Sequence, residues 1–139
     1  MMGVSDLFGR LNERGFATLE VILMITVLGI LSAVAIPRFT AITTSANTAK
    51  VQADLSTLDT AIALYQMDNG TPPTDLKNNL KDYVDNIEDL KPPSGNIYVN
   101  GEEKTASSYD LSDDKTRAVV LVNSTKYTSD SITKSKKTT

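Results

Sequence analysis

The stretch that decides the fold is Phe16–Ile36, which reads FATLEVILMITVLGILSAVAI. Its single ionisable side chain is Glu20, and the chain that follows is far more polar, with frequent Asp, Asn, Ser, Thr and Lys. As an α-helix at ~1.5 Å per residue, the stretch is ~31 Å long, about the thickness of the hydrocarbon core of a bilayer. No second stretch of this kind occurs in the sequence, which therefore predicts at most one membrane crossing.

The composition excludes several classes of function. The chain has 139 residues, enough for one domain, and contains neither Cys nor His. It therefore offers no thiolate nucleophile, no Cys-type metal site and no imidazole base. With a net charge of −3, the chain has no overall positive charge that would attract nucleic acid. Because no phosphate loop or nucleophile–base constellation stands out either, we expect a protein that is not an enzyme, has no cofactor and binds no specific nucleic acid.

Two ordinary explanations of the apolar stretch compete. The first is a cleaved secretory signal, because Arg10 and Arg14 precede the stretch and Ala33-Val34-Ala35 resembles an A-x-A cleavage site. Against it, the run exceeds the usual ~7–15 residues of a signal core and contains Glu20. The second is a plain signal anchor. Basic residues lie on both sides of the stretch, so the positive-inside rule gives little orientation.

A third explanation comes from the junction before the stretch, Arg14-Gly15-Phe16-Ala17-Thr18-Leu19-Glu20. It resembles the processing motif of prepilins, in the family of type IV pilins and type II secretion-type pseudopilins. In that family a short polar leader ends in Gly, and the cut falls before a Phe or another apolar residue. The resemblance implies a leader at residues 1–15, cleavage between Gly15 and Phe16, and N-methylation of the new Phe16 amine. Residues 16–36 are then retained as a transmembrane and filament-core helix.

The same resemblance assigns a role to Glu20. A charged group costs ~2.5–3.5 kcal/mol at the centre of a membrane helix. One explanation of Glu20 is that it lies near the helix start, where its carboxylate reaches the membrane–water interface and is stabilised by the helix N-terminus. In the family, the corresponding Glu neutralises the amine of a neighbouring subunit. An ion pair in low dielectric depends strongly on distance, so it sets the stagger between helices. We therefore expect Glu20 to act in subunit assembly.

Gly29 and Pro37 are the predicted kink positions. Both match places where family members carry Gly and Pro, and the helical pattern continues beyond Pro37 to about Asn69. Proline removes one backbone hydrogen bond from a helix, which kinks or loosens it. A simple helix boundary at the membrane surface is the alternative.

The helix after Pro37 carries two apolar stripes. At ~100° per residue their centres lie ~160° apart, whereas a surface helix of a globular domain needs only one stripe. We expect the first stripe to bind the chain's own sheet and the second to face neighbouring helices. The first stripe is Val51, Leu55, Leu58, Ile62 and Tyr65; the second is Phe39, Ile42, Ala46, Ala49, Ala53, Leu64 and Met67.

Residues 37–139 are predicted to form a pilin-like globular domain. It comprises a helix at 37–69, a connecting helix at about 75–91, a sheet at about 96–128 and a polar tail expected to fray. Asn69-Gly70 ends the first helix, Asn100-Gly101 predicts a hairpin, and the β-branched run at 117–122 predicts a central strand. The fold class is α+β: a long N-terminal helix, membrane-spanning in its first half, packed on a small antiparallel sheet of three to four strands.

Three carboxylates crowd one predicted turn, at Asp110, Asp113 and Asp114. Some pseudopilins bind calcium near the C-terminal end of their sheet, and carboxylate oxygens suit that ion. The resemblance thus makes these residues calcium candidates. Their spacing does not match an EF-hand loop, and a solvated acidic turn is the alternative.

The resemblance predicts a structural subunit of a type IV pilus or pseudopilus, polymerised through its N-terminal helix. Its implied partners are further copies of the chain, minor pilins, a prepilin peptidase, an assembly ATPase and a membrane platform protein. The precursor is expected as a single-pass protein of the cytoplasmic (inner) membrane, and the product as a cell-surface filament. A membrane-anchored extracellular binding domain that never polymerises is the alternative. Pilus, secretion pseudopilus and DNA-uptake pseudopilus all remain open.

Overall fold

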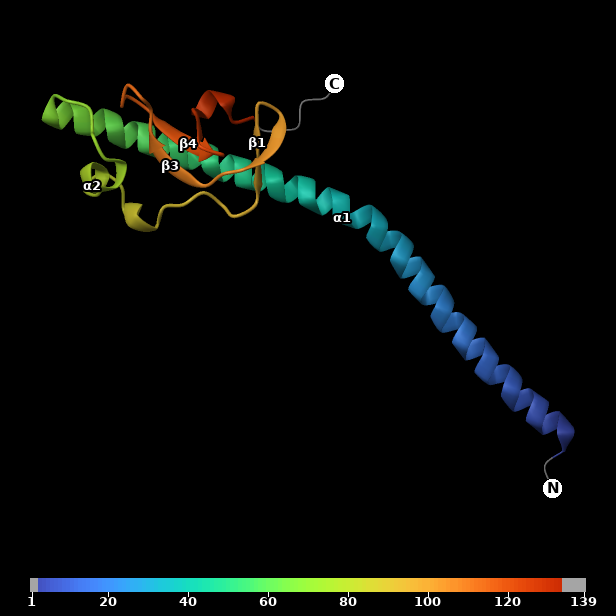
Figure 1. Ribbon diagram of the computed structural model, residues 1–139. Coiled ribbons are helices and arrows are strands. Elements are labelled where there is room, and N and C mark those ends of the chain that lie inside the picture. The colour runs from blue at the N-terminus through green and yellow to red at the C-terminus, as the bar shows by residue number, and fades with distance from the viewer. Residues whose placement is uncertain (1–2, 134–139) are drawn as a thin grey trace. The chain divides into compact units, whose positions relative to one another are not determined.

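The computed structural model describes residues 3–133, without the side chains of residues 5–13 and 37. The chain divides into two compact units, Met1–Thr40 and Ala41–Thr139. Helix α1 (Val4–Asn69) contributes to both units (Figure 1). The second unit also holds the short helix α2 (Leu76–Leu80), the 3-10 helices η1 (Ile87–Asp89) and η2 (Ser129–Ser131), and all five strands.

Helix α1 ends where the sequence predicts. Gly70 adopts a left-handed conformation with φ 70°, and its N–H donates to the Gln66 carbonyl at 2.8 Å. Glycine takes this conformation without the steric cost that a Cβ imposes. Gly29 and Pro37 both lie within α1. The kink assigned to them remains a prediction.

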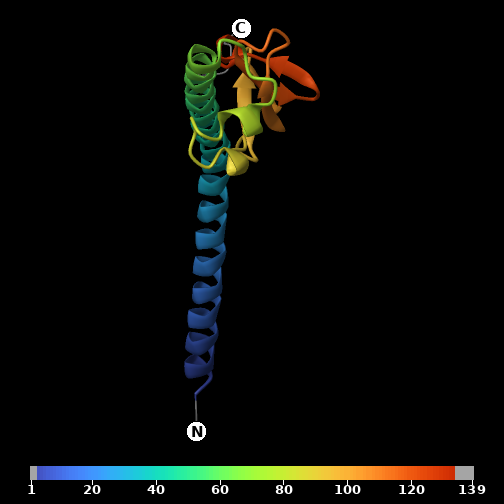
Figure 2. The same cartoon turned by 90° about the vertical axis from the view of Figure 1, so that its left-hand side faces the viewer.

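The strands form two antiparallel sheets. In one, β1 (Asn96–Val99) pairs with β2 (Glu102–Thr105); the other has the order β3-β4-β5. β4 (Ala118–Val122) is central, between β3 (Ser108–Leu111) and β5 (Thr125–Tyr127). The β1–β2 hairpin turns at Asn100-Gly101, both with positive φ. Figure 2 shows the strands gathered on one side of the C-terminal part of α1.

The fold class predicted from the sequence, a long helix with a small antiparallel sheet, is thereby confirmed, with two differences in detail. Five strands in two sheets replace one sheet of three to four strands. The strand missing from the prediction is β2, whose residues Glu102–Thr105 are mostly exposed and charged. Such a strand shows no apolar alternation, but charged side chains protect a free sheet edge from pairing with other chains.

The first apolar stripe of α1 forms the core, as expected. Val51, Leu55, Leu58 and Ile62 are completely buried, and Tyr65 packs against them. They belong to one hydrophobic cluster with side chains from both sheets, which include Ile97, Val99, Ala118, Val120 and Val122. The second unit therefore has one core, shared between α1 and the two sheets.

The predicted connecting helix at about 75–91 is interrupted. α2 ends at Leu80, whose carbonyl accepts from the N–H groups of Tyr83 and Val84. Asn86 then adopts a left-handed conformation with φ 55°. Asp82, Asp85 and Asn86 are poor helix formers, and carboxylates near a helix C-terminus oppose its dipole. The regularly spaced apolar residues of this segment nevertheless contribute to the core, since Leu76, Leu80 and Ile87 are buried.

The C-terminal segment corrects another expectation. Residues up to Thr133 do not fray: Ile132 is 3% exposed and forms a bridge with Val99. The Asn100 N–H donates to the Ser131 carbonyl at 2.8 Å, and the Thr133 N–H donates to the Tyr98 carbonyl at 3.1 Å. Ile132 is one apolar residue among polar neighbours, too weak a pattern to predict a strand pairing. The remainder of the predicted polar tail, 134–139, lies outside the described residues.

Polar side chains of α1 attach it to the backbone of the sheets and of this C-terminal segment. The Thr48 hydroxyl accepts from the Tyr98 N–H at 2.9 Å, and Asp59 accepts from the Ala118 N–H at 2.6 Å. Gln52 donates to the Ile132 carbonyl at 2.6 Å. A buried backbone group without a partner is costly, so these bonds fix where each segment sits on the helix.

We predict that Thr48→Val destabilises the protein by about 1–3 kcal/mol, because the buried Tyr98 N–H loses its acceptor. Thr60→Val is the matched control: Thr60 is exposed, and its hydroxyl donates only to the Ser56 carbonyl one turn earlier. That change should stay within about 0.5 kcal/mol of the parent. Urea denaturation in detergent, followed by circular dichroism, measures both. If Thr48→Val and Thr60→Val lost the same stability, the Thr48–Tyr98 hydrogen bond would not be what attaches the sheet to the helix.

Candidate functional site

The residues predicted for processing, assembly and the helix kink lie in the first unit, on α1. Gly15, Phe16 and Glu20 are all exposed, and nothing lies within 4 Å of where a Cβ would stand on Gly15. Every residue from Phe16 to Ile36 is exposed, so the most apolar segment of the chain has no partner within the described structure. Gly29 likewise has open space around it.

This segment has the length and composition of a membrane-spanning helix. Among the described residues, one helix, α1, is long enough and apolar enough to cross a membrane. Its most apolar stretch has a mean hydropathy of 2.5, and none of that stretch is buried. An exposed helix of this kind is unfavourable in water because apolar surface there has no compensating burial. The segment therefore requires either lipid or other helices around it.

The hydroxyl groups of the segment are satisfied within the helix, which sequence reasoning did not foresee. Thr18 donates to the Arg14 carbonyl at 2.9 Å, Thr26 to Ile22 at 2.8 Å and Ser32 to Leu28 at 2.7 Å. Such bonds to the carbonyl one turn back remove the penalty of exposing a hydroxyl to hydrocarbon. The sequence signal for them is simply Ser or Thr inside an apolar helix.

Glu20 is the exception. It is the remaining polar side chain of the segment, and none of the described side chains pairs with it. It begins a helix face that continues with Leu23, Met24, Val27 and Leu28, which together with Glu20 line a shallow apolar hollow. A carboxylate beside an apolar face is costly in hydrocarbon unless a cation meets it. The site thus presents a carboxylate that is unpaired among the described residues.

The structure does not gather the three predicted calcium candidates around one point. Asp110 and Asp113 face the Lys126 ammonium, at 3.6 and 2.9 Å. Asp114 instead accepts from the Ser112 hydroxyl and the Thr116 N–H. Those bonds lower the pKa of Asp114 to about 2, the Ser112 bond contributing most. In the described part of the chain, no group of three or more Asp, Glu, His or Cys side chains is placed to hold a metal ion.

Comparisons with known proteins point to the same family as the junction motif. The chain is 34% identical over 65 residues to the type II secretion system core protein G of Klebsiella michiganensis, covering 47% of this chain and 46% of the relative. It is 36% identical over 63 residues to the protein of that name from Klebsiella pneumoniae, 45% of each chain, and 30% identical over 63 residues to that of Escherichia coli, 45% of this chain and 43% of the relative. The chain thus spans less than half the length of the curated relatives it matches.

These matches confirm the resemblance to the pilin and pseudopilin family, and within it they favour the type II secretion-type pseudopilins. No protein-family model matches the chain. No solved structure matches it either.

Proposed function

We propose that this chain is a filament subunit of a type II secretion-type pseudopilus, made as a membrane precursor and polymerised through α1. The observation that carries the proposal is the fully exposed apolar segment at Phe16–Ile36, in which Glu20 is the one polar group without a partner among the described residues. The relatives named core proteins of a type II secretion system support this assignment over an adhesive or motile pilus.

Processing is the first step of the proposed mechanism. Residues 1–15 stay in the cytoplasm, and a prepilin peptidase hydrolyses the peptide bond between Gly15 and Phe16. This cleavage frees an α-amine on Phe16, which the family resemblance indicates is then methylated. The amine stays cationic at neutral pH, since its ordinary pKa is ~7.7–8.0. The retained segment holds the subunit in the inner membrane until assembly.

Assembly then supplies the partner that Glu20 lacks. The Phe16 amine of one subunit meets the Glu20 carboxylate of its neighbour within a bundle of apolar helices. In that low dielectric the attraction is strong and distance-dependent, so it selects one stagger between neighbouring helices. An assembly ATPase and a membrane platform protein would extract subunits from the bilayer, and minor pilins would join the same filament. The role is structural and needs neither catalysis nor a cofactor.

A second exposed surface on α1 supports the same proposal. Eight exposed residues of the second unit recur at spacings of four and three along α1, and we call them the outer seam. Six of its members are small, which allows helices to approach closely, and an apolar residue stands at each end. The outer seam comprises Ile42, Ala46, Ala49, Ala53, Ser56, Thr60, Ala63 and Met67.

The outer seam shares five residues with the second apolar stripe predicted from the sequence, adds Ser56, Thr60 and Ala63, and leaves out Phe39 and Leu64. It lies away from the core stripe, which is buried under the sheets. Ile42 is 68% and Met67 81% exposed, a costly arrangement for a helix that never meets a partner. We assign the outer seam to helix packing between neighbouring subunits in the filament.

We predict that the processed protein begins at Phe16. The Gly15-Phe16 junction matches the prepilin motif at several positions, whereas Ala33-Val34-Ala35 matches only an ordinary signal cleavage site. N-terminal sequencing of the membrane-associated protein, with its intact mass, distinguishes the two. A start at Ile36 would assign the chain to ordinary secretion and reject the proposed function.

We predict that Glu20→Ala blocks filament growth but not membrane insertion or cleavage. Removing a carboxylate lowers the cost of inserting the segment. The Phe16 amine would then enter the helix bundle unpaired, and losing one partner of a buried pair costs ~3–5 kcal/mol. Processed subunits should accumulate in the membrane. Electron microscopy of sheared surface material from overproducing cells, labelled with an antibody to the chain, reads out filaments.

Thr26→Val is the matched control for this experiment, since it removes a polar group already satisfied within the helix. Filaments should form normally in that variant. Normal filaments from Glu20→Ala, in a strain lacking the parent gene, would reject the role of Glu20. Absence of filaments from the parent chain under all conditions would favour the non-polymerising membrane anchor.

A further inference from the structure

The end of β3 and the loop that follows it converge on a single ammonium group. The Lys126 Nζ lies 2.8 Å from the Leu111 carbonyl oxygen, 2.9 Å from Asp113 Oδ1 and 3.6 Å from Asp110 Oδ2. Two carboxylates and one backbone carbonyl are the oxygen donors that calcium takes from proteins. Here they surround a side chain of the protein itself.

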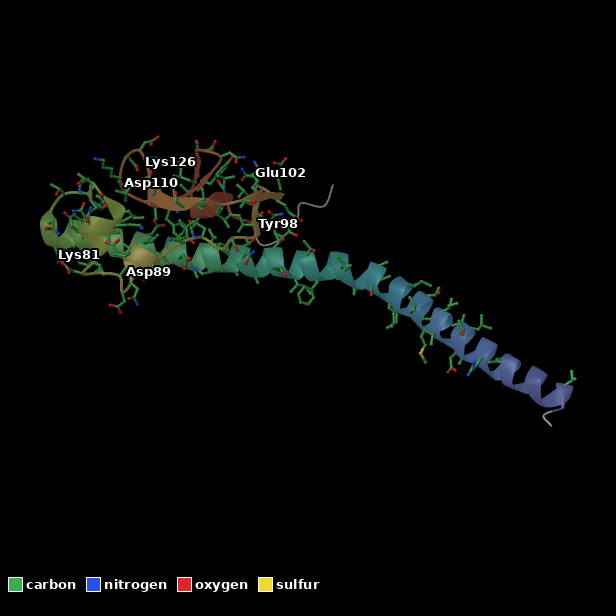
Figure 3. The ribbon with its side chains drawn as sticks, turned by 60° about the horizontal axis from the view of Figure 1, so that its bottom comes forward. Lys81, Asp89, Tyr98, Glu102, Asp110 and Lys126 are labelled. Atoms are coloured by element: carbon green, nitrogen blue, oxygen red, sulfur yellow. The ribbon has the colours of Figure 1, made fainter. Side chains whose placement is uncertain are left out.

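The sheet topology explains how Lys126 reaches this position. Lys126 lies on β5 and pairs with Leu121 of the central strand β4, whereas Leu111 ends β3 on the other side of β4. The side chain therefore crosses one strand to reach the far edge of the sheet. Figure 3 shows Lys126 and Asp110 beside each other on the sheet surface.

The remaining carboxylate of the loop is held by the loop itself. Asp114 accepts from the Ser112 hydroxyl and from the Thr116 N–H, while the Ser112 hydroxyl oxygen accepts from the Arg117 N–H. The loop also closes through Ser112 N–H to Arg117 carbonyl and Lys115 N–H to Ser112 carbonyl bonds, at 2.8 and 2.9 Å. Asp114 is thus directed into the loop, and Lys126 engages only Asp110 and Asp113 among the three carboxylates.

These positions do not fit a bound calcium ion. Calcium requires six to eight oxygen ligands at ~2.3–2.6 Å, including the oxygens that Lys126 now contacts. A divalent cation beside the ammonium would also be repelled by a like charge at contact distance. The neighbouring carboxylates in turn favour the charged form of Lys126 and raise its pKa, the bond to Asp113 contributing most.

We propose that Lys126 is a built-in cation that takes the place of a metal ion at the β3–β4 loop and makes the fold independent of divalent cations. The proposal does not depend on filament assembly, because every group in it belongs to one subunit. It predicts that removing the ammonium exposes a latent calcium site in which Asp110, Asp113 and the Leu111 carbonyl supply the protein ligands and water completes the coordination shell.

The test is thermal unfolding of the full chain in detergent, with millimolar calcium or with a chelator. The parent protein should melt at the same temperature in both. Lys126→Ser should melt about 2–6 °C lower in chelator, since it loses a small cluster of exposed ion pairs. Calcium should restore most of that shift, and magnesium much less, because magnesium sheds its water reluctantly.

Two further variants make the test specific. Lys126→Arg keeps the charge and should stay independent of calcium. Lys81→Ser removes an exposed lysine for which no ion pair occurs among the described residues, and should melt like the parent in both conditions. The proposal is overturned if calcium raises the melting temperature of the parent, if Lys126→Ser melts like the parent, or if calcium fails to rescue it.

Discussion

The constraint on which the rest of the structure depends is that one helix must satisfy two sets of partners. Between Ala41 and Asn69, α1 buries Val51, Leu55, Leu58 and Ile62 under its own sheets. The sheets are too small to cover the helix on all sides, so the outer seam stays exposed. A surface helix of a monomeric domain needs only one apolar stripe, so the second supports the proposed assembly.

Among the described residues, no buried side-chain polar atom lacks a hydrogen-bond partner. On the inner face Thr48 and Asp59 accept backbone N–H groups of the strands, which fixes the sheets on the helix. In the apolar segment Thr18, Thr26 and Ser32 close their hydrogen bonds within the helix. Within this segment, Glu20 is the polar side chain that pairs with none of the described side chains. That contrast singles it out from the structure as well as from the motif.

The sequence predicted those features that depend on periodicity or on special backbone geometry. The core stripe, the end of α1 at Asn69-Gly70, the Asn100-Gly101 hairpin and the central strand β4 are of this kind. It did not predict β2, whose charged residues lack alternation, or the pairing of Ile132 with Val99. Nor did it reveal Lys126, because contacts across a sheet depend on strand order, which no local pattern encodes. The sequence therefore left both a calcium site and a solvated acidic turn open at Asp110, Asp113 and Asp114, and it did not indicate the contacts of Asp110 and Asp113 with Lys126.

The central claim, that α1 turns its outer seam toward other subunits, is tested most directly by thiol accessibility. The chain has no cysteine, so an introduced thiol is the sole reactive group. Ala53→Cys, on the outer seam, should react with a maleimide in detergent-dispersed subunits and be protected in intact filaments. Thr116→Cys, exposed on the β3–β4 loop, is the reference and should react in both. Equal labelling of Ala53→Cys in subunits and filaments would contradict the account.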